Sequence, residues 1–479
     1  MGHILISAAH KSSGKTMVTT GLVRALTLRG RRVATFKKGP DYIDPKWLAA
    51  AAGLTSGGSC YNLDFHTQTD DEIKDMFARH SANADISIIE GNKGLHDGVD
   101  VEGSNSNAAL AKMLGAPVIL VIDASGITRG IAPLLKGYEV FDTDVNIAGV
   151  ILNKVMGPRH EEKLIAAVER YTNIPVLGSI RRNAKLNVDE RHIGLIPNNE
   201  YPAARTRIET LGEQIAAQVD LDRIEAIAAS AAKMAPAQAS DIASQTVRPD
   251  VRIAIAKDPA FGFYYADDLD ALKAAGAQLV YFNTLNDVYL PTCDGLFLGG
   301  GFPETQMKRL EANKTLRTRI KAAIEAGLPT YAECGGLMYL SRSISWHEDK
   351  HEMVGVIPGD TTMHIRPQGR GYVQLHPPPK HPWNISEEAC AFDGEYIPAH
   401  EFHHSRLENI DTDLTFAFEV LRGQGVNGTH DGIVMHNMVA GYTHLRSTSR
   451  CRWAEAFTAF VRQKKQERRG NPSPAQIAG

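Results

Sequence analysis

The feature that most constrains the fold is a series of short, almost wholly apolar runs, each followed by a stretch of helical composition. In the first half of the chain these runs cover residues 3–7, 32–36, 85–90, 116–123 and 146–155. Runs without polar alternation are typical of parallel strands that are covered by helices on both faces. The sequence therefore predicts an α/β domain built on a parallel sheet.

A second alternating pattern begins after a segment rich in Ala, Ser, Gln and Pro, the composition of a linker. The chain has 479 residues, enough for two or three domains. The later apolar runs again alternate with helical stretches, which indicates a second α/β domain. The predicted organisation is a first domain at 1–232, a linker at 233–250, a second domain at 251–462 and a flexible tail at 463–479.

Composition excludes several broad classes of function. The formal net charge of -3 gives no general attraction to nucleic acid or to an anionic membrane. No apolar run approaches the ~20 residues of a membrane-spanning helix, and the N-terminus enters a strand without a signal peptide. The five cysteines are scattered, without CxxC pairs, which fits a reducing cytoplasm and a thiol that acts alone.

The stretch AAHKSSGKTMVTTGLVRAL, beginning at Ala8, has the form of a phosphate-binding loop between a strand and a helix. Backbone N–H groups at the helix N-terminus would surround the phosphates. Lys15 would face the β- and γ-phosphates, and the Thr16 hydroxyl would bind Mg²⁺. The strict pattern has Gly where Ala9 stands, but the strand before and the amphipathic helix after support a nucleotide site. The residues expected to bind the nucleotide here are Ser12, Ser13, Gly14, Lys15 and Thr16.

Two further polar loops follow the second and third strands, at the edge where parallel sheets place their ligands. These loops are FKKGPDYIDP and IIEGNKGLHDGVD. Carboxylates there can hold Mg²⁺, and lysines can neutralise a phosphoryl group during its transfer. Ordinary polar loops are the alternative. The charged residues of these loops are Lys37, Lys38, Asp41, Asp44, Glu90, Lys93, Asp97 and Asp100.

A second constellation surrounds Cys334 in LPTYAECGGLMYL, which reads as a strand, a sharp turn and a helix. This order is that of a nucleophile elbow with sulfur as the nucleophile, and a helix N-terminus favours the thiolate. The backbone of the glycine-rich loop LFLGGGFPE, with Gly300 and Gly301, could form an oxyanion hole. His444, in MVAGYTHLR, is the candidate base. A buried structural thiol is the alternative for Cys334.

These motifs, in this order, resemble the cobyrinic acid a,c-diamide synthases, glutamine-dependent amidotransferases that act on corrinoid or related tetrapyrrole acids. The resemblance covers almost the whole chain and includes SGKT, FKKGPDYIDP, EGNKGLHDG, APVILVID, GVILNKV, LFLGGGFPE, YAECGGLMYL and EFHHSR. It implies an N-terminal ATP-binding half similar to dethiobiotin synthetase and a C-terminal half similar to class I glutaminases. It also implies a homodimer.

The resemblance further implies roles for single residues. Cys334 would attack the side-chain amide of glutamine, and His444 would move the proton. In the other domain ATP would phosphorylate an acetate carboxylate, and ammonia would displace the phosphate. Asn153 matches a position near the purine base, and Asp97 one near the reacting carboxylate. Lys37 is expected to bind ATP, Thr16, Asp41 and Glu90 to hold Mg²⁺, and Tyr42, Lys93, His96 and His403 to contact the substrate.

The chain departs from the family at two places. Many class I glutaminases have Glu two residues after the His, whereas this chain has Arg446, so the third member of the triad is unassigned. The loop around Lys93 and His96 resembles the branch found with dissimilatory sulfite reductase, which is thought to amidate sirohaem. We therefore favour sirohaem as the substrate, with cobyrinic acid as the alternative.

Two further alternatives remain at the level of the sequence. One is a cobyric acid synthase, which amidates other carboxylates, and the other is a regulatory P-loop ATPase with a degenerate glutaminase domain. The run HEFHHSR could suggest a metal site, but it lacks the i,i+4 spacing of helical metal pairs. We expect it to lie near the macrocycle or the route of ammonia, and a polar strand edge is the other interpretation.

Overall fold

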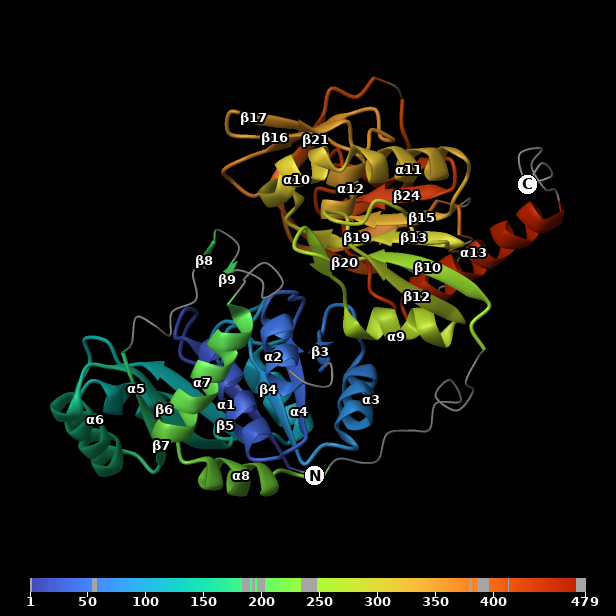
Figure 1. Cartoon of the computed structure of the whole chain (residues 1–479). Helices are drawn as coiled ribbons and strands as arrows, with labels where there is room; N and C mark the ends of the chain where they lie inside the picture. Colours follow the sequence, from blue (N-terminus) through green and yellow to red (C-terminus); the bar gives the residue numbers. More distant parts are fainter. Residues whose placement is uncertain are drawn as a thin grey trace. The chain divides into compact units, whose positions relative to one another are not determined.

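The computed structural model describes residues 2–53, 58–182, 190–191, 194–195, 203–233, 248–378, 381–383, 385, 396–411 and 413–470. The chain divides into two compact units. Unit 1 comprises Met1–Phe65 and Thr69–Gln238, and unit 2 comprises His66–Gln68 and Ala239–Gly479. Figure 1 shows the elements of each unit.

Unit 1 is built on a sheet of seven strands, and each neighbouring pair is parallel. A short antiparallel pair stands apart from it. The strands are β1 (Gly2–Ala8), β2 (Val33–Lys38), β3 (Cys60–Leu63), β4 (Ile86–Glu90), β5 (Val118–Asp123), β6 (Ile147–Val155), β7 (Val176–Arg181), β8 (Glu190–Arg191) and β9 (Gly194–Leu195).

The order of the large sheet is β3-β2-β4-β1-β5-β6-β7, so β1 lies in the middle with later strands on both sides. Ligands of such sheets bind at the carboxyl ends of the strands, where the strand order reverses. The helices are α1 (Lys15–Leu28), α2 (Asp44–Ala52), α3 (Asp70–Ser81), α4 (Asn107–Leu114), α5 (Ile131–Phe141), α6 (Pro158–Tyr171), α7 (Ala204–Gln218) and α8 (Leu221–Ala229).

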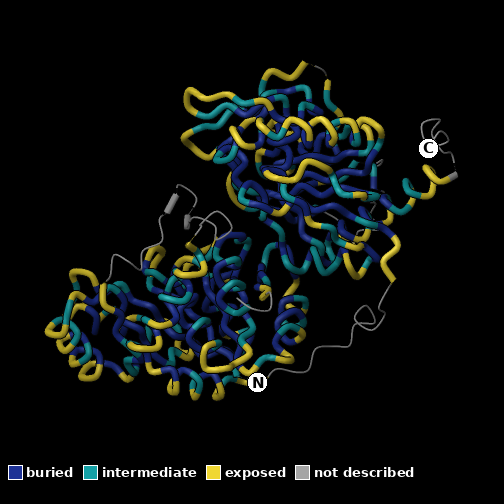
Figure 2. Tube along the Cα trace, viewed as in Figure 1, coloured by how far each residue is buried: buried dark blue, intermediate teal, exposed yellow. Residues whose placement is uncertain are grey.

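The core of unit 1 explains the unbroken apolar runs of its strands. Apolar residues of α3, α4, α5 and α6 form one core with the side chains of one face of the sheet, Leu5 and Leu120 among them. Helices α1, α2 and α7 pack together in a separate group. Ile4 and Ile6, which alternate with Leu5, are also fully buried. Both faces are therefore covered, as Figure 2 shows for the strands of this sheet.

Unit 2 is built on a sheet of nine strands, of order β12-β10-β13-β15-β24-β23-β22-β19-β20. A four-stranded sheet of order β17-β16-β18-β21 and the pair β11-β14 complete it. The strands are β10 (Val251–Ala256), β11 (Phe261–Phe263), β12 (Ala277–Phe282), β13 (Gly295–Leu298), β14 (Gly300–Gly301), β15 (Thr330–Glu333), β16 (Ser343–Trp346), β17 (Asp349–Glu352), β18 (Asp360–Met363), β19 (Gly369–His376), β20 (Ile397–His403), β21 (Ser405–Glu408), β22 (Thr415–Arg422), β23 (His430–Met435) and β24 (Met438–Gly441).

The first five strands of the nine-stranded sheet are parallel, and antiparallel pairing begins between β24 and β23. One core contains residues of α10, α11 and α12, and the other contains residues of α9 and α13, so the large sheet is again covered on both faces. The helical elements are α9 (Ala266–Ala274), the 3₁₀ turn η3 (Pro303–Gln306), α10 (Met307–Ala312), α11 (Lys314–Glu325), α12 (Gly335–Leu340) and α13 (Trp453–Gly470).

These units confirm the predicted α/β fold, with a parallel P-loop sheet followed by a second α/β unit. Most of the linker predicted at 233–250 falls on residues 234–247, outside the described residues, so its boundaries stay predictions. Helix α13 continues to Gly470 and therefore enters the segment 463–479 that was predicted as a flexible tail. In the described part of the chain, no helix has the length and apolar character that crossing a membrane requires.

Candidate active site

The phosphate-binding loop lies between β1 and α1 in unit 1 and is supported by Asn153 at the end of β6. Gly14, the residue before α1, has a φ of 87°. A Cβ at this position would lie 2.3 Å from Nδ2 of Asn153, so only glycine fits. Nδ2 of Asn153 donates to the carbonyl of Ser13 at 2.9 Å. Asn153, predicted near the purine base, thus contacts the loop itself.

Lys15 is the first residue of α1 and reaches the loop that follows β4. Its Nζ donates to the carbonyl oxygen of Lys93 at 2.6 Å. Burial, and then the nearby charge of Lys37, lower the pKa of Lys15 to about 8. The ammonium group is therefore held where its charge is poorly compensated, as suits a lysine that receives phosphate oxygens.

A buried cluster joins the carboxyl ends of β2 and β4 to the start of α1. Lys37 of β2 pairs in register with Glu90 of β4, and its Nζ lies 2.7 Å from Oε1 of Glu90. Lys37 also forms an ion pair with Asp44. The hydroxyl oxygen of Thr16 lies within hydrogen-bond distance of both carboxylates, 2.8 Å from Oε1 of Glu90 and 3.1 Å from Oδ2 of Asp44. Two carboxylates, one hydroxyl and one ammonium thus share a single site.

The structure brings Asp44 to Thr16, and it gives Asp41 a different contact. Oδ1 of Asp41 accepts hydrogen bonds from the backbone N–H of Ile43 at 2.8 Å and of Asp44 at 3.0 Å. This Asx turn fixes the chain just before α2. The other carboxylate oxygen of Asp41 is 3.8 Å from Nζ of Lys37, so Asp41 lies at the margin of the cluster.

The cluster has perturbed acid–base properties because it is buried. Burial raises the pKa of Glu90 to about 7; Asp44 adds to this effect, and Lys37 opposes it. Burial would also raise the pKa of Asp44, but the charge and hydrogen bond of Lys37 hold it below its ordinary value. Burial would lower the pKa of Lys37, but Asp44 and Glu90 hold it well above its ordinary value. Lys37 is therefore an ammonium ion at neutral pH.

The oxygen atoms of this cluster suit a hard cation such as Mg²⁺. Oε2 of Glu90 is fully buried and has no hydrogen-bond partner, and the Thr16 hydroxyl lies beside the same carboxylate. The described residues contain no group of three or more His, Cys, Asp or Glu side chains that could hold a metal by themselves. A magnesium ion here would need oxygen ligands from a bound nucleotide, as nucleotide-bound Mg²⁺ ordinarily has.

The remaining predicted residues of unit 1 lie in and near the loop after β4. Lys93 and Asp97 are exposed, and His96 is half-buried. Oδ2 of Asp97 accepts from the backbone N–H of Gly94 at 2.9 Å, which closes the loop. The ring of His96 stacks on Tyr138, with centroids 5.6 Å apart. Tyr42, also predicted to contact the substrate, is buried before α2.

In unit 2, Cys334 occupies the sharp turn between β15 and α12. Its backbone has φ 47° and ψ -101°, a strained conformation for a residue other than glycine. Its N–H donates to the carbonyl of Gly441 at 2.7 Å. A Cβ at Gly336 would lie 2.1 Å from the carbonyl oxygen of Leu298, so the helix can begin this close to β13 only with glycine. This geometry is that of a nucleophile elbow.

His444 follows β24, which runs parallel to β15, so the chain returns to the end of the sheet that carries Cys334. Nδ1 of His444 lies 3.3 Å from Oε2 of Glu333. Burial would lower the pKa of His444, but hydrogen bonds with Cys334 and Glu333 and their charges raise it to about 10. The predicted nucleophile and base therefore meet, although 110 positions separate them in the numbering.

The glycine-rich loop lies against both of these residues. A Cβ at Gly300 would lie 2.7 Å from Cε1 of His444. The backbone nitrogen of Gly301 lies 3.0 Å from the position that a Cβ of Gly335 would take, beside the elbow. The predicted oxyanion-hole residues are thus next to the nucleophile and the base.

His403, which was predicted to contact the substrate, is buried at the end of β20. Its Nδ1 donates to the carbonyl of Ser405 at 2.9 Å, and its ring stacks on Tyr442 with centroids 3.9 Å apart. His403 and Tyr442 line a cavity of about 280 Å³, together with Gln368 and residues of β21 and the loop before β23.

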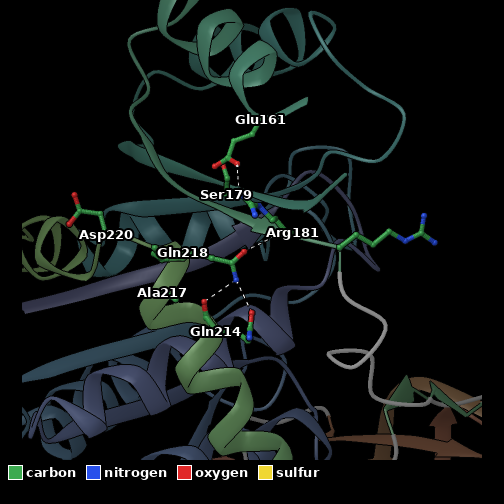
Figure 3. A pocket seen from close by; sticks show the side chains of 9 residues that line it. Glu161, Ser179, Arg181, Gln214, Ala217, Gln218 and Asp220 are labelled. Atoms are coloured by element: carbon green, nitrogen blue, oxygen red, sulfur yellow. Dashed lines mark hydrogen bonds and ion pairs between the residues drawn. The ribbon is translucent and has the colours of Figure 1, made fainter. Parts of the chain in front are cut away.

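A larger cavity of about 740 Å³ lies in unit 1 between α6, α7 and the edge strand β7 (Figure 3). Some of its polar groups bond to one another. Arg181 is 3.6 Å from Glu161, and the backbone N–H of Arg181 donates to Oε1 of Gln218 at 2.9 Å. The predicted site residues are absent from its lining, and we assign it no function.

Comparison with known proteins identifies both halves of the chain. Residues 4–196 match the family model of the CobQ/CobB/MinD/ParA nucleotide binding domain, and residues 252–450 match that of the CobB/CobQ-like glutamine amidotransferase domain. A protein of Magnetococcus marinus named cobyrinate a,c-diamide synthase is 44% identical over 96% of this chain and 97% of its own length. The chain belongs to the cobyrinate a,c-diamide synthase family.

Two further family members carry the same name. The protein of Methanosarcina acetivorans is 40% identical over 93% of this chain and 92% of its own length. That of Listeria monocytogenes is 40% identical over 93% of this chain and 96% of its own length. As a member of the cobyrinate a,c-diamide synthase family, the chain is an ATP-dependent ligase that uses glutamine as the nitrogen donor. None of these three relatives is named for sirohaem.

Two residues of these sites could not be given their roles from the sequence. Asp44 belongs to the predicted polar loop after β2, but the metal was expected at Asp41. Glu333 stands next to Cys334 in the sequence and received no role. In both cases the only indication in the sequence was a carboxylate close to a motif residue. Its role depends on which side chain it contacts in the fold.

Proposed function

We propose that the chain converts the a and c acetate carboxylates of cobyrinic acid into amides, with ATP as the activating substrate and glutamine as the source of ammonia. The observation that carries this proposal is the identity of 40% or more to proteins named cobyrinate a,c-diamide synthase, over nearly the full length of both chains. From the sequence alone, the loop around Lys93 and His96 favoured sirohaem as the acceptor. The names of the relatives favour cobyrinic acid, and we adopt it as the acceptor.

In unit 2, His444 accepts the thiol proton of Cys334, and the thiolate sulfur attacks the side-chain amide carbon of glutamine. Backbone N–H groups of Gly300 and Gly301 stabilise the oxyanion that forms. The imidazolium then gives its proton to the departing nitrogen, and ammonia leaves as a thioester remains. Water attacks the thioester with His444 as base, which releases glutamate and restores the thiol.

In unit 1, the loop of Ser12, Ser13 and Gly14 holds the phosphates of ATP through backbone N–H groups, and Lys15 neutralises their charge. Lys37 adds a second buried positive charge, and Asn153 keeps the loop in shape. Thr16 and Glu90, with Asp41 or Asp44, would hold Mg²⁺. When bound, that ion would neutralise phosphate charge during transfer.

The acceptor reaction takes place in two steps. A carboxylate oxygen of the macrocycle attacks the γ-phosphorus of ATP, the bond to the β–γ bridging oxygen breaks, and ADP leaves. Ammonia then attacks the acyl carbon, phosphate leaves with the electron pair of the C–O bond, and the nitrogen loses a proton. Asp97 is proposed beside the reacting carboxylate. Tyr42, Lys93, His96 and His403 are proposed contacts of the carboxylate-rich macrocycle.

A regulatory ATPase with a degenerate glutaminase domain is the alternative of a different class. The strained elbow of Cys334, its hydrogen bond with His444 and the glycine loop beside them support an active glutaminase instead. A degenerate domain would have no reason to keep a strained backbone at the nucleophile.

Mass spectrometry of the reaction products tests the acceptor. The enzyme is incubated with ATP, Mg²⁺ and glutamine, and cobyrinic acid or sirohaem is offered separately. We expect cobyrinic acid to exchange two carboxyl OH groups for NH₂, with sirohaem unchanged. Amidation of sirohaem alone would overturn the choice of acceptor. Glutamine hydrolysis without amidation of either would leave an amidotransferase whose acceptor is a different acid.

A further inference from the structure

A buried carboxylate lies directly behind the base of the glutaminase site. Glu333, the last residue of β15, is 3% exposed. Its Oε2 lies 3.3 Å from Nδ1 of His444, and its Oε1 accepts from the hydroxyl of Tyr331 at 2.5 Å and from the backbone N–H of Leu445 at 3.1 Å. The two bonds to Oε1 hold the carboxylate in place, with Oε2 toward the ring of His444.

We propose that Glu333 is the positioning residue for His444 and acts as the third member of the triad. It precedes the nucleophile Cys334 directly in the sequence. This inference rests on the proposed glutaminase reaction at Cys334. An ionised carboxylate only accepts hydrogen bonds, so Nδ1 of His444 must carry the proton. Nε2 is then the unprotonated nitrogen that can take the thiol proton of Cys334.

The residue that stands where many class I glutaminases have their glutamate cannot do this. Arg446 is a cation, and it is 1% exposed. Its Nε donates to Oδ2 of Asp267 at 3.0 Å, and its guanidinium lies over the ring of Tyr265, 4.7 Å from the centroid. The side chain of Arg446 is therefore engaged at the start of α9.

The other buried carboxylates around this end of the sheet hold backbone groups. Asp268 accepts from the N–H of Ser447 at 2.7 Å. The carboxylate of Asp431 accepts from the N–H groups of Tyr442 and Thr443, both at 3.0 Å, and that of Glu401 accepts from Gln424 and Gly425. Asp268 and Asp431 thus shape the chain that carries His444, and Glu401 holds the loop before β23. Glu333 is the one of these four that contacts the ring of His444.

In the described part of unit 2, the charged and titratable groups that contact His444 include Glu333, Cys334 and His400. The ring of His400 stacks on that of His444 with centroids 5.0 Å apart, and Nδ1 of His400 is 3.2 Å from the hydroxyl of Tyr265. Burial, and then the charge of His444, keep the pKa of His400 well below its ordinary value, so this ring is neutral. The negative charges that stabilise an imidazolium at His444 therefore belong to Glu333 and to the thiolate.

Glu333→Gln tests the proposal, because an amide keeps the shape of the side chain but presents an N–H donor to Nδ1. We expect kcat for glutamine hydrolysis to fall by about 10²- to 10⁴-fold with little change in KM. Amidation driven by free ammonia should stay at the wild-type rate. Tyr331→Phe removes one bond to Oε1 and leaves the contact with His444, so its loss should be smaller, below about tenfold. Glu325→Gln, at the exposed end of α11, is the matched control and should hydrolyse glutamine at the wild-type rate.

A purely structural Glu333 would not change the ionisation of the nucleophile. We expect the pH at which iodoacetamide begins to alkylate Cys334 to rise by about 1 to 3 units in Glu333→Gln. Glutamine hydrolysis within about threefold of wild type, together with an unchanged alkylation profile, would overturn the proposal. A wild-type enzyme that hydrolyses no glutamine under any condition would instead overturn the proposed function.

A measurement on the wild-type enzyme decides the matter if Glu333→Gln does not fold. Nitrogen-15 NMR of labelled histidine, with the His444 signals assigned from His444→Asn, reports which ring nitrogen carries the proton. We expect Nδ1 of His444 to be protonated throughout the titration. A neutral ring with a bare Nδ1 would overturn the assignment of Glu333.

Discussion

The two sites lie at the same place in their sheets, the carboxyl ends of parallel strands, but they are maintained by different forces. In unit 1 the site is organised by charge, with the ammonium of Lys37 between the carboxylates of Asp44 and Glu90. In unit 2 it is organised by backbone conformation, with Cys334 in a strained turn and Gly336 pressed against β13. Each arrangement matches its chemistry.

The difference reflects what each site must receive. Unit 1 binds a polyanion, so its positive groups are paired with carboxylates. Phosphate oxygens can replace these carboxylates as partners of the positive groups, and a metal ion can bind the carboxylates. In the proposed reaction unit 2 forms a covalent bond with glutamine, so the sulfur must be held within reach of the base before glutamine arrives. Substitutions in unit 1 should therefore act through charge, and those in unit 2 through geometry. Four predictions test this contrast.

The largest effect is expected from Lys37→Met. The substitution leaves the carboxylates of Asp44 and Glu90 buried without their cation, which should lower the free energy of unfolding of unit 1 by about 3–5 kcal/mol. Urea unfolding of the full chain measures this. Lys74→Met, which breaks only the exposed pair with Asp71, is the control and should leave the unfolding curve unchanged. Equal stability of the two variants would show that charge does not organise this site.

Lys15→Ala should reduce amidation by about 10²- to 10³-fold, because it removes one preorganised donor to the transferring phosphoryl group. The loss should be equal with glutamine and with free ammonia, since the phosphorylation step serves both. Glutamine hydrolysis without acceptor should persist. Lys163→Ala, on the exposed surface of α6, is the control. A defect seen only with glutamine would contradict the assignment of Lys15 to ATP.

Gly336→Ala should destabilise unit 2 by about 1–3 kcal/mol, because the new methyl group collides with the carbonyl of Leu298. Glutamine hydrolysis should fall with it, while amidation from free ammonia continues. Gly137→Ala is the matched control, since a Cβ there meets nothing within 4 Å and the residue lies inside α5. An equally active Gly336→Ala enzyme would mean that the elbow tolerates a shift of its helix.

The smallest effect concerns the pH dependence of ATP use. The pKa of Lys15 is about 8, below its ordinary value, so its ammonium is present below this pH and is lost as the pH rises through it. The KM for ATP should therefore increase above pH 8, by up to about tenfold per pH unit. In Lys15→Arg the charge persists, and the increase should vanish. A KM for ATP that stays constant in the wild-type enzyme would contradict the role of Lys15.

Local motifs were predictable from the sequence because their residues are contiguous. The run at 3–7 became β1, the following SGKT became the start of α1, and YAECGG became the elbow. Short apolar runs before glycine-rich turns carry this information within a few residues. The antiparallel strands β19, β22 and β23 were not predicted. Their polar faces and mixed residues give a weaker pattern than the parallel runs.

The partners of the motif residues were beyond the sequence alone. Asp44 contacts Thr16 across 28 positions, and Glu333 contacts His444 across 111. Nothing in either local pattern says which of two nearby carboxylates will face the motif. Asp41 accepts backbone hydrogen bonds in the turn before α2, whereas Asp44 pairs with Lys37 and Thr16. Only the fold distinguishes a carboxylate that caps a turn from one that serves the site.

The most direct test of the whole account follows the nitrogen atom. Wild-type enzyme and Cys334→Ala are each given ATP, Mg²⁺ and cobyrinic acid, with either glutamine labelled with nitrogen-15 at its amide or labelled ammonium. Mass spectrometry then locates the label in the product. The account predicts that wild-type enzyme incorporates label from both donors, whereas Cys334→Ala incorporates it from ammonium alone. Label transferred from glutamine by Cys334→Ala would contradict the assignment of Cys334 as the source of ammonia.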